Sequence, residues 1–90
     1  MTIKRDVTIC NKRGLHARAA AKFVTLARTY DCDIVVHRDG EEAPGSSIMD
    51  LLMLAAGPGT AVTLTAQGPD AEEALKVLGD LVECGFEEDD

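Results

Sequence analysis

The sequence is poor in aromatic residues: it has no Trp, one Tyr and two Phe in 90 residues. A core built from this composition must be aliphatic, made of Leu, Ile, Val and Ala. Apolar residues still account for 46% of the chain, so we expect a folded domain and not a disordered segment. The length predicts a single domain over residues 1–90, with a modest core and no deep enclosed active site.

Long apolar runs are absent as well. No stretch reaches the length that crosses a bilayer, and the first residues lack the apolar segment of a signal peptide. We therefore expect a soluble, cytoplasmic protein that has no membrane partner.

Cysteine is sparse, and its spacing indicates no metal site. Cys10, Cys32 and Cys84 are an odd, widely separated set without a Cys-x-x-Cys pair, which predicts reduced thiols. A metal ion could in principle be bound by Cys10, Cys32, His16 and His37 together. Their spacing does not favour this alternative, and we expect no metal site. His37 shares a strand face with Asp33 and Val35, so we interpret it as a surface residue.

The charge is segregated along the chain. The formal net charge of −7 argues against a nucleic-acid partner. Yet residues 7–30 hold no Asp or Glu and five of the basic residues, namely Lys12, Arg13, Arg18, Lys22 and Arg28. A basic zone on an otherwise acidic chain predicts a site that accepts an anion.

Hydrophobic periodicity predicts seven elements in the order β-α-β-β-α-β-α. The predicted strands are residues 2–9, 32–38, 41–44 and 60–66. The predicted helices are residues 17–28, a segment with the apolar helical stripe Ile48, Leu51, Leu52 and Ala55, and a segment from Ala71 that Gly85 ends. The fold class is α+β: an open-faced two-layer sandwich, with a four-stranded antiparallel sheet and three helices on one face.

Local signals mark the element ends. Asp39-Gly40 predicts a hairpin turn, and Ser46-Ser47 predicts a helix N-cap. Asp70 with Glu73 forms a capping-box pattern for the last helix, and we expect the acidic residues 87–90 to be solvated.

His16 is the candidate chemical residue, because it lies where the loop after Gly14 becomes the first helix. Unpaired amides and the macrodipole make a helix start favourable for an anion, and imidazole can carry a transient phosphoryl group. Arg18 is placed to bind phosphate oxygens, while Lys12 and Arg13 raise the local potential. On spacing alone, a surface histidine that caps the helix is the more common interpretation.

These residues resemble a known family. Gly14-Leu15-His16-Ala17-Arg18 with Ala20 is similar to the active-site loop of the HPr phosphocarriers of the bacterial phosphotransferase system. Ser47-Ile48-Met49 and the Leu-rich turn after it resemble the second signature of that family. Asn11-Lys12, the Leu51–Leu54 segment and the acidic ending after Gly85-Phe86 are most similar to its nitrogen-related branch, NPr.

The resemblance implies a phosphoryl relay and not a stand-alone enzyme. His16 would accept a phosphoryl group from a phosphoenolpyruvate-dependent enzyme I and donate it to a nitrogen-related or sugar enzyme IIA, with Arg18 coordinating the phosphate. It also implies a cytoplasmic monomer without a cofactor. An HPr kinase/phosphorylase is a further implied partner, which would phosphorylate Ser47 and add negative charge to the docking face.

Three positions depart from the family pattern. Ala19 stands where the family usually has Pro, which affects the rigidity of the first helical turn more than its chemistry. Ser46 replaces a common Lys, so a kinase would meet two adjacent serines. Asp50 replaces a usual Gly and adds a charge beside Ser47.

The second helix is apolar on every side, although a surface helix in so small a domain buries only one stripe. We expect the surplus apolar residues, Ile48, Met49, Leu52 and Met53, to form an exposed partner-binding patch near His16. The alternative is a wider core-facing surface.

Three other functions remain as alternatives. An HPr-like regulator would act mainly through phosphorylation of Ser47, but such proteins lack the active-site histidine that is present here as His16. An acyl carrier would have Asp-Ser-Leu where this chain has Ser-Ser-Ile, and it would leave the basic zone unexplained. A complete enzyme would need a nucleotide loop or a metal set, and neither pattern occurs.

Overall fold

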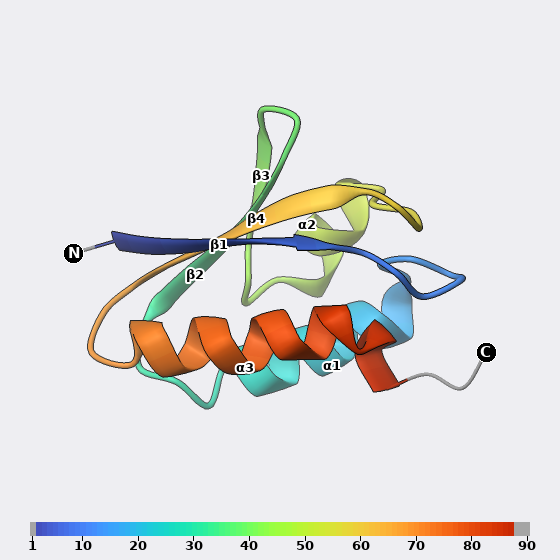
Figure 1. Ribbon diagram of the computed structural model, residues 1–90. Helices are drawn as coiled ribbons and strands as arrows, with labels where there is room; N and C mark the ends of the chain where they lie inside the picture. Colours follow the sequence, from blue (N-terminus) through green and yellow to red (C-terminus); the bar gives the residue numbers. More distant parts are fainter. Residues whose placement is uncertain (1, 88–90) are drawn as a thin grey trace.

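The computed structural model describes residues 2–87, which form a four-stranded antiparallel sheet with three helices on one of its faces (Figure 1). In chain order the elements are β1 (Thr2–Thr8), α1 (Ala17–Ala27), β2 (Asp33–Arg38), β3 (Glu41–Pro44), α2 (Ile48–Met53), β4 (Ala61–Gln67), α3 (Ala71–Glu83) and the short 3₁₀ turn η1 (Gly85–Glu87). Among these described residues, no helix has the length and apolarity that a membrane span needs. The predicted fold class and element order are confirmed.

The strands lie in the order β1-β4-β2-β3. β4 is central, with Val62 opposite Val7 of β1 and Leu64 opposite Val36 of β2. The first strand of the chain is therefore hydrogen-bonded to the last one, although more than fifty residues separate them. This arrangement brings the loop after β1 beside the loop before β4, and the candidate site is built there.

The core lies between the sheet and the helices, and it is aliphatic apart from two rings. Alternate residues of each strand face the helices, and the predicted stripe of α1 is buried together with Ala19. Phe23 is 2% exposed and Phe86 is fully buried. The residues that line the centre of the core come from every layer: Ile9, Leu15, Phe23, Val36, Leu51, Val62, Leu64, Val82 and Phe86. Both Phe rings therefore contribute almost their whole apolar surface to the core.

The β2–β3 hairpin turns at Asp39 and Gly40, whose φ angles are 48° and 81°. Positive φ at both positions is what a two-residue hairpin turn requires, so the predicted turn is confirmed. β3 ends at Pro44, which lacks the N–H that would extend the ladder.

Helix α2 is shorter than the sequence pattern predicts. It ends at Met53, and Ala55 lies beyond it with φ 53° and an exposed side chain. The prediction that Ala55 continues the helical stripe is wrong, because the left-handed residue turns the chain out of the helix. Leu54 and Ala56 are buried instead, on either side of this turn.

The capping box predicted for α3 does not form. Asp70 is the N-cap, but its side chain makes no capping hydrogen bond to α3. Its carboxylate accepts a hydrogen bond from the Asp31 N–H at 2.6 Å, so it joins the loop before β2 to the start of α3. At the other end Gly85 follows α3 with φ 71°, and η1 buries Phe86. The rest of the predicted solvated tail, residues 88–90, lies outside the described residues.

Candidate functional site

His16 is the N-cap residue of α1. Its backbone is extended (φ −87°, ψ 179°), and its carbonyl accepts the first helical hydrogen bond from Ala20 N at 2.8 Å. The half-buried ring points back at the helix, so that Nδ1 accepts a hydrogen bond from the Arg18 N–H at 3.3 Å. Since Nδ1 accepts, its lone pair faces the amides of the first turn, and the neutral ring holds its proton on Nε2.

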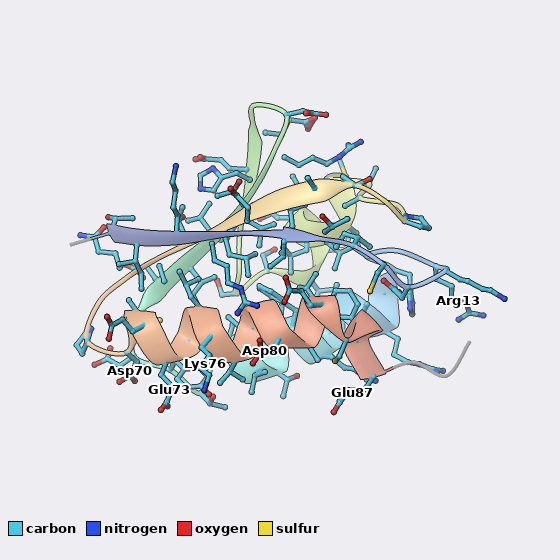
Figure 2. The ribbon with its side chains drawn as sticks, in the orientation of Figure 1. Arg13, Asp70, Glu73, Lys76, Asp80 and Glu87 are labelled. Atoms are coloured by element: carbon cyan, nitrogen blue, oxygen red, sulfur yellow. The ribbon has the colours of Figure 1, made fainter. Side chains whose placement is uncertain are left out.

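The surroundings of His16 are positive and polar. The Arg18 side chain is exposed, and the first turn of α1 contains no acidic residue that would repel an anion. Lys12 and Arg13 are exposed on the preceding loop. Arg13 projects at one end of the molecule, whereas the acidic start of α3 around Asp70 lies at the opposite end (Figure 2). The separation is incomplete, because Glu87 lines the same surface pocket as Arg18 and Lys22, and Arg28 lies at the end of α1 away from His16.

The loop before His16 packs directly on the loop after α2. Leu15 N donates to the Ala56 carbonyl at 2.9 Å, and Gly59 N donates to the Ile9 carbonyl at 2.7 Å. Gly14 has φ 64°, and a Cβ at this position would lie 2.6 Å from the Ala56 carbonyl oxygen. Glycine is therefore required here both by its conformation and by the close approach of the two backbones.

Helix α2 exposes most of the predicted apolar patch. Ile48 is 38%, Met49 69% and Met53 74% exposed. Leu52 differs from the expectation, because it is half-buried and packs against the core. Exposure of the other three side chains is confirmed, while partner binding by this patch remains a prediction.

The two ends of α2 contact the two ends of α1. Arg28 follows α1, and its Nη2 donates to the Ser46 carbonyl at 3.1 Å just before α2 begins. Ala56, which follows α2, binds Leu15, which precedes α1. The helices are therefore antiparallel neighbours, and the Met53 end of the patch is the end closer to His16.

Ser47, and not Ser46, is the N-cap of α2. Its Oγ accepts a hydrogen bond from Asp50 N at 3.2 Å. The predicted cap at Ser46-Ser47 is confirmed and is narrowed to one residue. Whether Ser47 is modified remains a prediction.

The remaining His and Cys residues lie apart from this site. His37 is half-buried on the helix-free face of the sheet, with Nε2 3.0 Å from Thr65 Oγ1 and Nδ1 3.4 Å from Glu42 Oε2. It is thus held by two neighbouring strands, more firmly than a plain surface residue. Within residues 2–87, no three His, Cys, Asp or Glu side chains are placed to share a metal ion.

The surroundings of Cys32 make its thiol less acidic than an ordinary cysteine. Burial raises the pKa of its thiol, and the carboxylates of Asp70, Asp31 and Asp33 raise it further. The thiol therefore stays protonated at a pH where an ordinary cysteine begins to ionise.

Sequence reasoning missed the residues that hold α2 in place. Arg38 Nη1 donates to the Leu54 carbonyl at 2.8 Å, and Arg28 holds Ser46 at the other end of the helix. One signal pointed to Arg38: by strand alternation it shares the core-facing side of β2 with Ile34 and Val36, where a charged residue is out of place.

Comparisons with known proteins all match members of a single family. Residues 3–84 match the family model described as the PTS HPr component phosphorylation site. The phosphocarrier protein NPr of Shewanella violacea is 44% identical over 86 residues, which are 96% of this chain and 94% of the relative. The phosphocarrier protein HPr of Pseudomonas aeruginosa is 49% identical over 84 residues, which are 92% and 93% of the two chains.

A solved structure of a protein of the same kind has the same fold. The crystal structure of HPr-C-His from Thermoanaerobacter tengcongensis superposes with a TM-score of 0.92 and 41% sequence identity, covering 97% of this chain and 98% of that one. Relatives of both the NPr and the HPr kind therefore match nearly the whole length.

Proposed function

The chain belongs to the HPr family and is an HPr/NPr-type phosphocarrier of the phosphotransferase system; from this we propose that it carries the phosphoryl group on Nδ1 of His16. The observation that carries the proposal is the hydrogen bond from the Arg18 N–H to Nδ1. This bond indicates that Nδ1 is the ring nitrogen whose lone pair faces the start of α1, where an anion is favoured.

The chemistry follows from this geometry. The Nδ1 lone pair attacks phosphorus, the Nδ1–P bond forms, and the bond between phosphorus and the donor group breaks. The ring becomes an imidazolium that keeps its proton on Nε2. In the second transfer the next acceptor attacks phosphorus, the Nδ1–P bond breaks, and the neutral imidazole is restored. The Arg18 N–H then donates to a phosphoryl oxygen in place of Nδ1, and the exposed Arg18 guanidinium supplies a second, charged donor. Because phosphoryl transfer has a loose transition state, such positioning and charge are most of what the carrier must provide.

Intact mass measurement tests the acceptor. The protein is incubated with enzyme I and phosphoenolpyruvate, beside His16→Ala and, as a control, His37→Ala. We expect one added phosphoryl group in the wild type and in His37→Ala, none in His16→Ala, and its loss in mild acid. Labelling of His16→Ala would contradict the assignment.

We propose that the exposed residues Ile48, Met49 and Met53, with the edge of Leu52, form the surface on which enzyme I and an enzyme IIA dock in turn. Large apolar side chains that are 38–74% exposed on one short helix mark an interaction site, and Met adapts to different partners. The patch must stay open for both enzymes, so we propose that the carrier works as a cytoplasmic monomer. Met53→Glu should raise KM for enzyme I, whereas Lys76→Glu on the distant α3 should not. An unchanged KM in Met53→Glu would remove this part of the proposal.

We further propose that phosphorylation of Ser47 by an HPr kinase/phosphorylase would weaken docking. Its Oγ lies at the start of α2 and accepts a hydrogen bond from the Asp50 N–H, and Ser47 directly precedes Ile48 of the apolar patch. A phosphate there adds negative charge to the docking surface, and the nearby Asp50 carboxylate opposes it at the same helix end. Ser47→Asp should therefore slow phosphorylation of His16, while Ser46→Asp should have a smaller effect. Equal rates for both variants and the wild type would contradict this role.

A further inference from the structure

We propose that Arg38 is a positioning residue for phosphoryl transfer, which holds the His16 loop through the post-α2 loop, residues 54–59. The inference rests on the proposed role of His16 as the phosphoryl acceptor. Arg38 does not touch the reacting atoms; it acts through the Leu54 carbonyl.

The first step is the bond that Arg38 makes. Its side chain leaves the end of β2 on the core-facing side and places Nη1 2.8 Å from the Leu54 carbonyl oxygen. Leu54 is the C-cap of α2, where the helix dipole favours a positive group. Arg38 Nε is buried and makes no hydrogen bond within the described part of the chain. Burial of a donor without a partner costs stability, so stability alone is a poor reason for an arginine at this position.

The second step is the shape of the post-α2 loop. Directly after Leu54, Ala55 adopts φ 53°, which is unfavourable for any residue with a Cβ. Such a turn persists only when its two ends are fixed. One end is fixed by Arg38 at Leu54. The other is fixed by the bond between Gly59 N and the Ile9 carbonyl.

The third step links this loop to the site. Between its fixed ends, the post-α2 loop presents the Ala56 carbonyl to Leu15 N at 2.9 Å. Leu15 immediately precedes His16, and Gly14 packs against the same carbonyl with no room for a side chain. A shift of Ala56 would therefore move the backbone that sets the His16 ring over the first turn of α1. Small displacements of this kind lower the rate of a reaction that depends on positioning.

The fold supplies a matched control. Arg28 also donates from a terminal guanidinium nitrogen to a backbone carbonyl beside α2, but at the opposite end, on Ser46. Loss of Arg28 removes a comparable bond to α2 without touching the post-α2 loop. The two arginines thus separate a general effect on α2 from a specific effect on the His16 loop.

The experiment compares Arg38→Met, Arg38→Lys and Arg28→Met with the wild-type protein. Hydrogen exchange of the Leu15 amide is followed by NMR, and kcat and KM are measured with enzyme I and phosphoenolpyruvate while the carrier concentration is varied. In Arg38→Met we expect Leu15 exchange to rise and kcat to fall, each by about tenfold, the order expected for one hydrogen bond to a charged group. KM should change little, because Arg38 lies outside the docking surface. Arg38→Lys should restore most of kcat, and Arg28→Met should leave the Leu15 amide and kcat unchanged.

The proposal is overturned if Arg38→Met leaves Leu15 exchange and kcat at wild-type values, or if Arg28→Met lowers both as much. Should Arg38→Met fail to fold, Arg38→Gln takes its place in the same comparison. If the wild-type protein is not phosphorylated on His16, the proposed function fails, and the Leu15 amide alone then decides whether Arg38 holds the loop.

Discussion

The guanidinium of Arg5 lies directly on the backbone of Gly79. Arg5 extends from β1 across α3, where Nη1 donates to the Lys76 carbonyl at 3.0 Å and Nη2 binds Asp80 at 3.2 Å and Glu83 at 2.7 Å. A Cβ built on Gly79 would overlap the guanidinium group. A glycine in the middle of a helix, normally a weakness, is here the condition for an arginine that ties the first strand to the last helix.

Gly79→Ala should therefore stabilise the protein less than the helix propensity of alanine implies. The flexible end of Arg5 must move, and loss of its exposed ion pairs should lower the free energy of unfolding by up to about 1 kcal/mol, which offsets the propensity gain, as measured by urea denaturation. In an Arg5→Ala background the same change should instead add up to about 1 kcal/mol, the helix-propensity gain. An offset of the propensity gain that persists without Arg5 would show that another neighbour needs the space.

Ala55→Gly should stabilise the protein. Ala55 is exposed and has φ 53°, so glycine would remove the cost of a left-handed backbone without losing a buried contact. We expect a gain of about 0.5–1 kcal/mol in the free energy of unfolding. Ala61→Gly is the control, since Ala61 is also exposed but lies in β4 with ordinary strand geometry, and there glycine should destabilise. Destabilisation by Ala55→Gly would contradict the left-handed assignment.

Cys32 should be the slowest of the three cysteines to react with iodoacetamide near pH 8. Burial and then the carboxylates of Asp70, Asp31 and Asp33 raise the pKa of its thiol, so less of it is thiolate at that pH. In a protein with Cys10→Ser and Cys84→Ser, the reaction rate against pH should have its midpoint above that of the same thiol in urea.

The same raised pKa has a consequence for stability. The folded state holds the Cys32 proton more tightly than the unfolded chain does, so the stabilising contribution is complete below the unfolded pKa. It is lost as the pH rises through the folded pKa. Asp70→Asn removes one neighbouring charge and should move the alkylation midpoint down; no movement would show that Asp70 contributes little beside burial.

Arg18→Gln should slow phosphorylation of His16 by about 10–100-fold, the range that a hydrogen bond between a charged donor and phosphate commonly supplies. Lys22→Gln is the matched control one turn later on α1, because its Nζ is bound to the Phe86 carbonyl at 2.7 Å. Stopped-flow measurement with enzyme I and phosphoenolpyruvate should show a loss for Arg18→Gln alone. An equal loss in both variants would indicate a diffuse effect of net charge and not coordination by Arg18.

The sequence predicts the elements well because periodicity and turn residues act locally. The four strands, the first and third helices and the Asp39-Gly40 turn all come within a few residues of their observed bounds. The strand order is less accessible, because pairing of β1 with β4 depends on packing of the whole chain. The early end of α2 cannot be predicted for a related reason: the apolar stripe continues to Ala55, but the chain turns after Leu54 to reach the His16 loop.

The sequence predicts those site residues whose contacts are with near neighbours in the chain. It does not predict the contacts that join residues far apart in the sequence. His16 at a helix start and Ser47 as an N-cap follow from neighbouring residues. The side chain of Asp70 was assigned to its own helix, but it binds Asp31 from a distant loop. Arg28 and Arg38 act on carbonyl groups, which every residue possesses, so no residue pattern reveals their partners.

The pairing of β1 with β4 also governs how the protein can form during synthesis. The first strand finds its hydrogen-bond partner only after residues 61–67 have been made, and the core is closed by Phe86, almost at the end of the described chain. At translation speeds of about 5–20 residues per second, the segment before β4 therefore waits for seconds without its native neighbour. The carrier should acquire its fold, and with it a functional His16 loop, only after the chain has been made as far as Phe86.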